Sequence, residues 1–88
     1  MPDHMVVAAF TNEPDAALLP AERERVRELS DGGVLQAAYL SADRSEAWLV
    51  IRGDDSDATR NVMESMPLYP YLEIRGIDEV NSIAPPNG

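Results

Sequence analysis

The chain has 88 residues and carries seven basic against sixteen acidic side chains, so its formal net charge at pH 7 is -9. This length accommodates one domain, and the acidic balance excludes the clustered basic side chains with which proteins bind nucleic acids or anionic membranes. The lack of cysteine excludes disulfides and thiolate metal sites, and a single histidine excludes a histidine-rich metal centre unless several chains each contribute one. We expect one soluble, cytoplasmic domain over residues 1–88 that needs no cofactor and no metal.

The first half of the chain contains the signals of a strand, a helix and a hairpin. The apolar run at residues 5–10 predicts a strand, and the helix formers at 16–30 predict a helix that a glycine pair ends. Two β-like runs follow at 34–41 and 46–52, joined by a short polar link. That link has the length of a hairpin loop, so the two strands are expected to be antiparallel neighbours.

The second half predicts one more helix and one more strand. Aspartate and serine residues at 54–57 can cap a helix at 57–66, which Pro67 then ends. Residues 71–80 predict the last strand, in which Gly76 marks a bulge.

The resulting order βαββαβ is typical of the ferredoxin-like fold. This α+β fold has a four-stranded antiparallel sheet with two helices on one face. We expect its core to span about residues 4–80 and the tail at 81–88 to be mobile or to depend on a partner.

Both faces of the predicted sheet carry apolar side chains. In the run at 5–10 both alternating sets are apolar, and in the run at 46–52 Trp48 and Val50 oppose a second apolar set. Two helices cover only one face of a sheet, so the second apolar face predicts a further layer. The simplest such layer is the sheet of a second copy, which makes a homodimer the expected assembly.

One segment resembles a known family. Residues 65–74, with the sequence SMPLYPYLEI, closely resemble the helix-to-strand signature of muconolactone isomerases, in which two prolines flank an aromatic residue. His4 stands where those enzymes have a histidine before the first strand. The stretch at 19–35 is similar to YCII-related proteins of the same superfamily, and the two resemblances together span about residues 5–80.

The resemblance implies a dimeric α/β barrel, in which two ferredoxin-like sheets face each other, as a homodimer or a higher oligomer. It also implies a pocket for a small lactone-like or aromatic-derived compound, and a double-bond shift by proton transfer without cofactor or metal, in catechol catabolism.

The chain departs from both families. Residues 36–40, QAAYL, replace a histidine, tryptophan and arginine cluster of the isomerases. Glu22 and Met66 stand where YCII-like proteins have a histidine and an aspartate.

Proton transfer next to a carbonyl requires a positioned base and a donor that stabilises the enolate. We consider His4, Glu22 and Tyr71 as the catalytic candidates. His4 has a second interpretation, as a solvent-exposed residue at a frayed strand start. Glu22 can also be a solvated carboxylate that complements a helix dipole, and Tyr71 can be a core residue.

The candidates for contact with a ligand are Tyr39, Leu68, Tyr69 and Glu73. Prolines on both sides of Leu68 and Tyr69 restrict the backbone, which suits a pocket wall, although the segment can also simply close the end of the core. Tyr39 can instead be a core residue. For Glu73 the structural alternative is a cross-strand ion pair with Arg75 or Arg52.

Three functions are compatible with these features. The first is a cofactor-free isomerase of the muconolactone isomerase type, acting on a small lactone or aromatic-derived compound. The second is a non-catalytic dimeric protein of the same fold that binds a small molecule. A haem-binding or oxygen-using member of the superfamily is disfavoured, because the C-terminal half of the chain contains no histidine.

Overall fold

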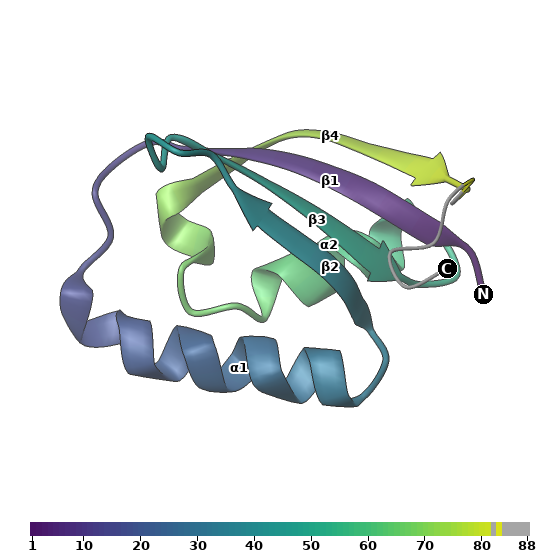
Figure 1. Cartoon of the computed structure of the whole chain (residues 1–88), viewed down its shortest axis with the longest axis horizontal. Helices are drawn as coiled ribbons and strands as arrows, with labels where there is room; N and C mark the ends of the chain where they lie inside the picture. The colour runs from purple at the N-terminus through teal and green to yellow at the C-terminus, as the bar shows by residue number, and fades with distance from the viewer. Residues whose placement is uncertain (82, 84–88) are drawn as a thin grey trace.

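The structure, a computed structural model, describes residues 1–81 and residue 83 (Figure 1). Most of the tail at 81–88, which was expected to be mobile or to depend on a partner, thus lies outside the described residues. Along the described chain the elements are β1 (Asp3–Phe10), η1 (Ala16–Leu18), α1 (Leu19–Asp31), β2 (Leu35–Leu40), β3 (Glu46–Arg52), α2 (Ser56–Glu64), η2 (Tyr69–Tyr71) and β4 (Leu72–Val80).

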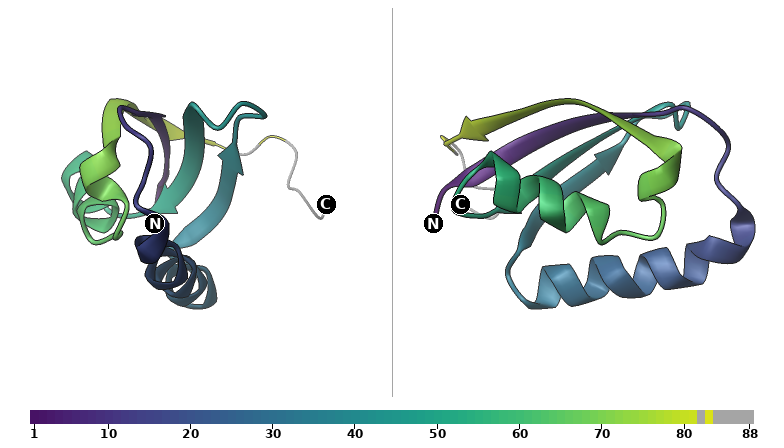
Figure 2. Two further views of the ribbon diagram at one scale, coloured as in Figure 1. Left: turned by 90° about the vertical axis from the view of Figure 1, so that its left-hand side faces the viewer. Right: turned by 180° about the vertical axis from the view of Figure 1, so that it is seen from behind.

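The four strands form one sheet in the order β2-β3-β1-β4, with every neighbouring pair antiparallel. Both helices lie on the same side of this sheet (Figure 2). The predicted ferredoxin-like α+β fold is therefore confirmed. No helix among the described residues is long and apolar enough to cross a membrane.

Local signals set most of the element ends. The Asp55 side chain accepts a hydrogen bond of 2.8 Å from the N–H of Ala58 and caps α2, as the polar run at 54–57 predicts. After α1 the chain turns at Gly33, whose φ of 76° suits glycine. The expected bulge in β4 lies beside Gly76, because Val7 pairs with Gly76 while Ala8 pairs with Ile74.

Several ends differ from the sequence prediction. The helix expected at 57–66 runs from Ser56 to Glu64, so it ends before Pro67, and the strand expected at 34–41 runs from Leu35 to Leu40. Residues 16–18 form a short 3-10 turn before α1, because the Asp15 side chain accepts a hydrogen bond from the N–H of Ala17. Tyr71 belongs to η2 and not to β4, since its N–H donates to the carbonyl of Leu68 at 2.9 Å. β1 begins at Asp3, which is paired on both sides, with Arg52 and with Val80.

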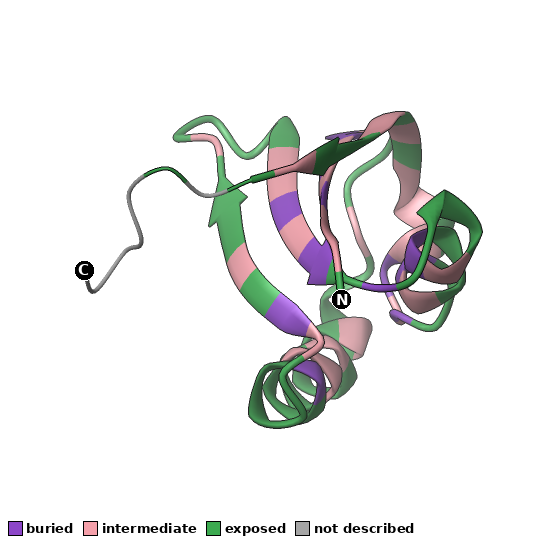
Figure 3. Cartoon of the chain, turned by 90° about the vertical axis from the view of Figure 1, so that its right-hand side faces the viewer, coloured by how far each residue is buried: buried purple, intermediate pink, exposed green. Residues whose placement is uncertain are grey.

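The core lies between the helices and one face of the sheet, where β1 and β3 contribute their central residues (Figure 3). β2 is buried at its start and exposed toward its end. The exposed end of β2 lies at the end of the sheet where β1 also ends. The buried core residues are Val6, Leu29, Leu35, Leu49, Ile51, Met63 and Met66.

The other face of the sheet, which we call the open face, carries no helix among the described elements (Figure 2). Strand register places Met5, Val7, Trp48 and Val50 together on it, and all four are half-buried. None of them belongs to the buried core cluster. The apolar character of both faces is thus confirmed, while the second layer that it predicts stays a prediction.

Candidate functional site

Two adjoining cavities lie at the end of β1, where Phe10 is placed. The inner cavity, of about 290 Å³, is bounded by α1, α2 and the helix-facing side of the sheet, and its walls are mainly aliphatic side chains and methionines. The outer cavity, of about 650 Å³, is bounded by the loop after β1, the start of α1 and the β2–β3 hairpin. The two cavities share Phe10, Leu40 and Leu68, so a ligand could extend from one into the other.

Glu22 is the one carboxylate in the lining of the inner cavity. It lies in the first turn of α1, where the helix dipole favours an acidic side chain, and it is half-buried. Its Oε1 accepts a hydrogen bond of 3.1 Å from the backbone N–H of Leu68, in the loop that follows α2. This bond orients the carboxylate, and the second oxygen has no hydrogen-bond partner among the described residues, so it can act on a ligand.

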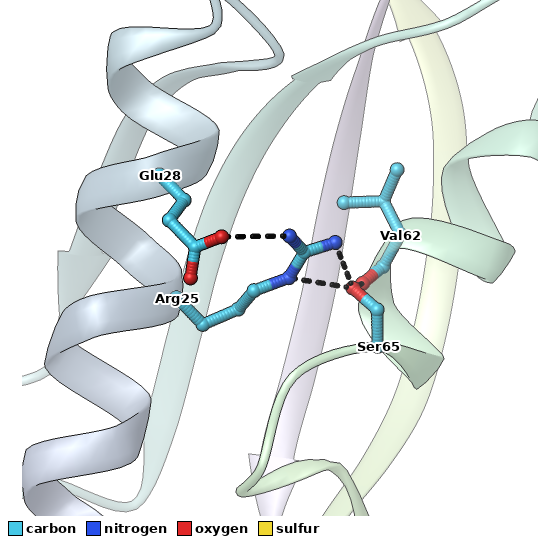
Figure 4. Close-up of polar contacts among 4 residues, drawn as sticks. All are labelled: Arg25, Glu28, Val62 and Ser65. Carbon is cyan, nitrogen blue, oxygen red and sulfur yellow. Dashed lines mark hydrogen bonds and ion pairs between the residues drawn. The ribbon is translucent and has the colours of Figure 1, made fainter.

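A second contact joins the same two segments one helical turn further along α1 (Figure 4). Nε and Nη2 of Arg25 donate hydrogen bonds of 3.1 and 2.9 Å to Oγ of Ser65, which follows α2. Ser65 Oγ donates in turn to the carbonyl of Val62 at 2.6 Å, and Arg25 Nη1 lies 3.7 Å from Oε2 of Glu28. The Arg25–Ser65 contact therefore holds α1 at the position that places Glu22 at the cavity.

Of the residues proposed from the sequence, Glu22, Tyr39 and Leu68 line the inner cavity together. Leu68 is buried and supplies both an apolar wall and the N–H that binds Glu22. Tyr39 adjoins the inner cavity from the edge strand β2, but its register partner is Trp48, so its ring lies on the open face and not among the helix-facing side chains. Its side chain is exposed, which contradicts the alternative of a core tyrosine.

His4 lies far from this cluster. It is on the helix-facing side of β1 and only 4% exposed, so the alternative of a solvent-exposed, frayed residue is wrong. The reason is that β1 is paired on both sides of His4, with Ile51 and Glu79. Phe10 is six positions further along the same extended strand, which corresponds to about 20 Å, and His4 lines neither cavity.

The remaining candidates also lie outside the two cavity linings. Tyr69 packs against the core cluster, and the backbone carbonyl of Tyr71 accepts hydrogen bonds from Thr11. Glu73 is exposed, pairs in register with Ala9, and its carboxylate lies 3.8 Å from Arg75 Nη2; this is an ion pair with one of the expected partners, but within β4 and not across strands. Of the proline-flanked segment, only Leu68 forms part of a cavity wall.

The β2–β3 hairpin is the part of the site that sequence reasoning did not identify. Asp43, Arg44 and Ser45 line the outer cavity, and Arg44 has a positive φ of 64°. Hydrogen bonds from the side chain and the N–H of Ser45, and from the hydroxyl of Ser41, lower the pKa of Asp43 from 3.8 to about 2. The sequence shows these residues only as a polar link, because their place at a cavity depends on how the hairpin packs beside Phe10.

The sequence of the chain also matches a known family. The family model described as muconolactone delta-isomerase matches residues 4–84. The chain belongs to this family. The match covers the proline-flanked segment and Glu22, and so contains the whole inner cavity. Among curated proteins, no sequence matches the chain.

Membership of the muconolactone delta-isomerase family confirms the resemblance noted at residues 65–74, whereas the similarity to YCII-related proteins stays a prediction. Within the part of the chain that the structure describes, no three His, Asp or Glu side chains are grouped as they would be around a metal ion. The cytoplasmic location and the independence from cofactors also stay predictions.

Proposed function

We propose that this protein is a cofactor-independent isomerase that moves a proton within a small lactone or aromatic-derived compound, with Glu22 as the base. The observation that carries the proposal is a single oriented carboxylate in an otherwise apolar cavity. Apolar walls keep water away from a reacting carbon, and such a site favours proton transfer between carboxylate and ligand. The family match supports the same reaction class.

The reaction needs one group that both takes and returns a proton. In an unsaturated lactone, the free oxygen of Glu22 removes a proton from the carbon next to the double bond, and the electron pair spreads into the ring carbonyl as a dienolate. Glu22 then returns the proton to the carbon at the far end of the dienolate. The double bond has shifted, atoms and charge balance, and no electrons leave the substrate.

Glu22→Gln is the variant that tests this role. Glutamine keeps the size of the side chain and an oxygen that can accept from Leu68, but it cannot act as the base. We expect the rate of isomerisation to fall by a factor of about 10² to 10⁴, with little change in stability. Proton–deuterium exchange in D₂O, followed by NMR on muconolactone and its carboxamide, measures the transfer directly.

Glu24→Gln is the matched control, because Glu24 is an exposed carboxylate of the same helix and lines neither cavity. It should exchange at the rate of the unmodified protein. Exchange by Glu22→Gln within twofold of that rate would contradict the proposed base. A protein that binds either ligand in the inner cavity but exchanges no proton would instead be the non-catalytic binding protein of the same fold.

We infer further that the protein assembles as a homodimer through the open face. The support is the group of half-buried apolar side chains there, Met5, Val7, Trp48 and Val50, without a helix across them. An antiparallel sheet that packs on one side only normally carries polar residues on the other. A second copy of the same face is self-complementary by symmetry, which suits a two-fold dimer.

A further inference from the structure

The charges around the two cavities point to the kind of ligand that the site accepts. In the inner cavity Glu22 is the only lining residue that carries a charge at neutral pH, and side chains such as Val26, Met63 and Met66 surround it. A ligand that contacts Glu22 there leaves water. A carboxylate on that ligand would be desolvated beside a second negative charge, and burial strengthens such repulsion.

The lining of the outer cavity does not compensate the negative charge of Glu22. Its ionisable lining residues are Glu13, Asp43 and Arg44, so the lining has two acidic side chains and one basic side chain. The pKa of Asp43 is lowered to about 2 by its hydrogen bonds with Ser45 and Ser41, so this carboxylate stays ionised throughout the physiological range. An anionic ligand would therefore meet a net negative lining in both cavities.

The other basic side chains of the described residues lie outside both linings. Four arginines are already in ion pairs: Arg25 with Glu28, Arg27 with Glu24, Arg52 with Asp3, and Arg75 with Glu73. The segment 82–88 contains no lysine, arginine or histidine in its sequence. The whole chain, with its net charge of -9, also repels anions at longer range.

We propose that this site selects an uncharged unsaturated lactone over the corresponding carboxylate. This inference rests on the proposed function, because it assumes that the ligand reacts at Glu22, and it deepens that function by naming the substrate class. Muconolactone itself bears a carboxylate, so the proposed substrate differs from the compound in the family's name. This chain discriminates by the presence of a charge on the ligand, and not by the ring.

The test compares muconolactone with its carboxamide, which has the same skeleton and nearly the same size but no charge. Saturated analogues of the two, which cannot isomerise, give dissociation constants by calorimetry. We expect the neutral analogue to bind at least about tenfold more tightly than the acid. Glu22→Gln should tighten the acid about tenfold or more, since it removes the nearest negative charge, and change the neutral analogue less than threefold.

Arg44→Gln decides whether the hairpin arginine captures a carboxylate from the outer cavity. Glutamine retains a Cβ, so the positive φ at this position is as unfavourable as in the unmodified protein. We expect the acid to bind this variant no more weakly than the parent. A loss of acid binding of tenfold or more, with the neutral analogue unchanged, would show that Arg44 recognises the carboxylate and would overturn the inference.

The remaining outcomes separate this inference from the proposed function. Proton exchange that depends on Glu22, together with equal or tighter binding of the acid, would overturn the inference and leave the isomerase proposal standing. Preferential binding of the neutral analogue without proton exchange would overturn the isomerase proposal and leave only the preference for the uncharged ligand. Failure of both analogues to bind would overturn the inference as well.

Discussion

Glu22 illustrates how a functional residue is formed by contacts distant in sequence. Its position in the first turn of α1 is a local matter, but the N–H that orients its carboxylate belongs to Leu68, 46 positions along the chain. Leu68 is in turn buried, so its backbone cannot move without disturbing the core. A base held in this way keeps one geometry before the ligand arrives, which is the condition for efficient proton transfer.

At the residue scale we predict that Thr59→Val stabilises the protein. Thr59 is fully buried in α2, and its Oγ1 has no hydrogen-bond partner among the described residues. A buried hydroxyl without a partner is unfavourable, and valine keeps the branched shape while removing it. We expect the free energy of unfolding, measured with urea, to rise by about 1 kcal/mol.

Thr11→Val provides the comparison for Thr59→Val. The Thr11 hydroxyl is exposed and donates to the carbonyl of Tyr71 at 3.3 Å, so its loss should lower the free energy of unfolding by no more than about 0.5 kcal/mol. A clear loss of stability in Thr59→Val would show that the buried hydroxyl has a favourable partner, contrary to the structure.

At the scale of elements, α1 is held to the rest of the molecule by few contacts. Leu29 is its only buried residue, near its C-terminal end, so the N-terminal turns that carry Glu22 depend on polar contacts to the loop after α2. These are the Glu22–Leu68 and Arg25–Ser65 hydrogen bonds. These two hydrogen bonds therefore determine where α1 places the Glu22 carboxylate relative to the cavity.

We predict that Arg25 and Ser65 are energetically coupled. In a double-mutant cycle of Arg25→Gln and Ser65→Ala, urea unfolding should give a coupling energy of about 0.5 to 1 kcal/mol, because the arginine is one-third exposed and water weakens the contact. Either variant should also slow proton exchange while the dissociation constant of the neutral analogue changes less, since the Glu22 carboxylate loses its fixed position.

Arg27→Gln is the control for that cycle, because Arg27 and its partner Glu24 are both exposed on the same helix. It should change stability by less than about 0.5 kcal/mol and leave proton exchange unaltered. A coupling energy of zero between Arg25 and Ser65 would mean that the contact in Figure 4 does not hold α1 in place.

At the scale of the whole molecule, the sheet separates two apolar faces with different roles. The helix-facing side contains the core and the two cavities, while the open face carries Trp48 and its neighbours without a covering helix among the described elements. Assembly through the open face would leave the cavities on the outside of each sheet.

We predict that Trp48→Asp dissociates the homodimer. A carboxylate in the middle of an apolar interface is buried without a partner, so the dimer dissociation constant should rise at least about 100-fold. Light scattering over a range of concentrations measures the assembly, and circular dichroism checks that the monomer stays folded. Trp48→Phe, which keeps an aromatic ring, should remain dimeric. An unmodified protein that is a folded monomer at micromolar concentration would contradict the proposed assembly.

The sequence by itself determined the features that depend on neighbouring residues. The order of strands and helices, the hairpin between the second and third strands, the Asp55 cap and the bulge beside Gly76 all follow from periodicity and turn chemistry, which act over a few residues. The apolar alternation of 5–10 also predicted two apolar faces, because side chains of a strand alternate strictly.

Only the tertiary structure decided which candidates meet. Glu22, Tyr39 and Leu68 come together at one cavity because α1, β2 and the loop after α2 pack around the end of β1, and the same packing adds Phe10 and the hairpin. His4 has the chemistry of a base but lies at the other end of the strand. The distances between such candidates are set by long-range packing, which the local pattern of a sequence does not reveal.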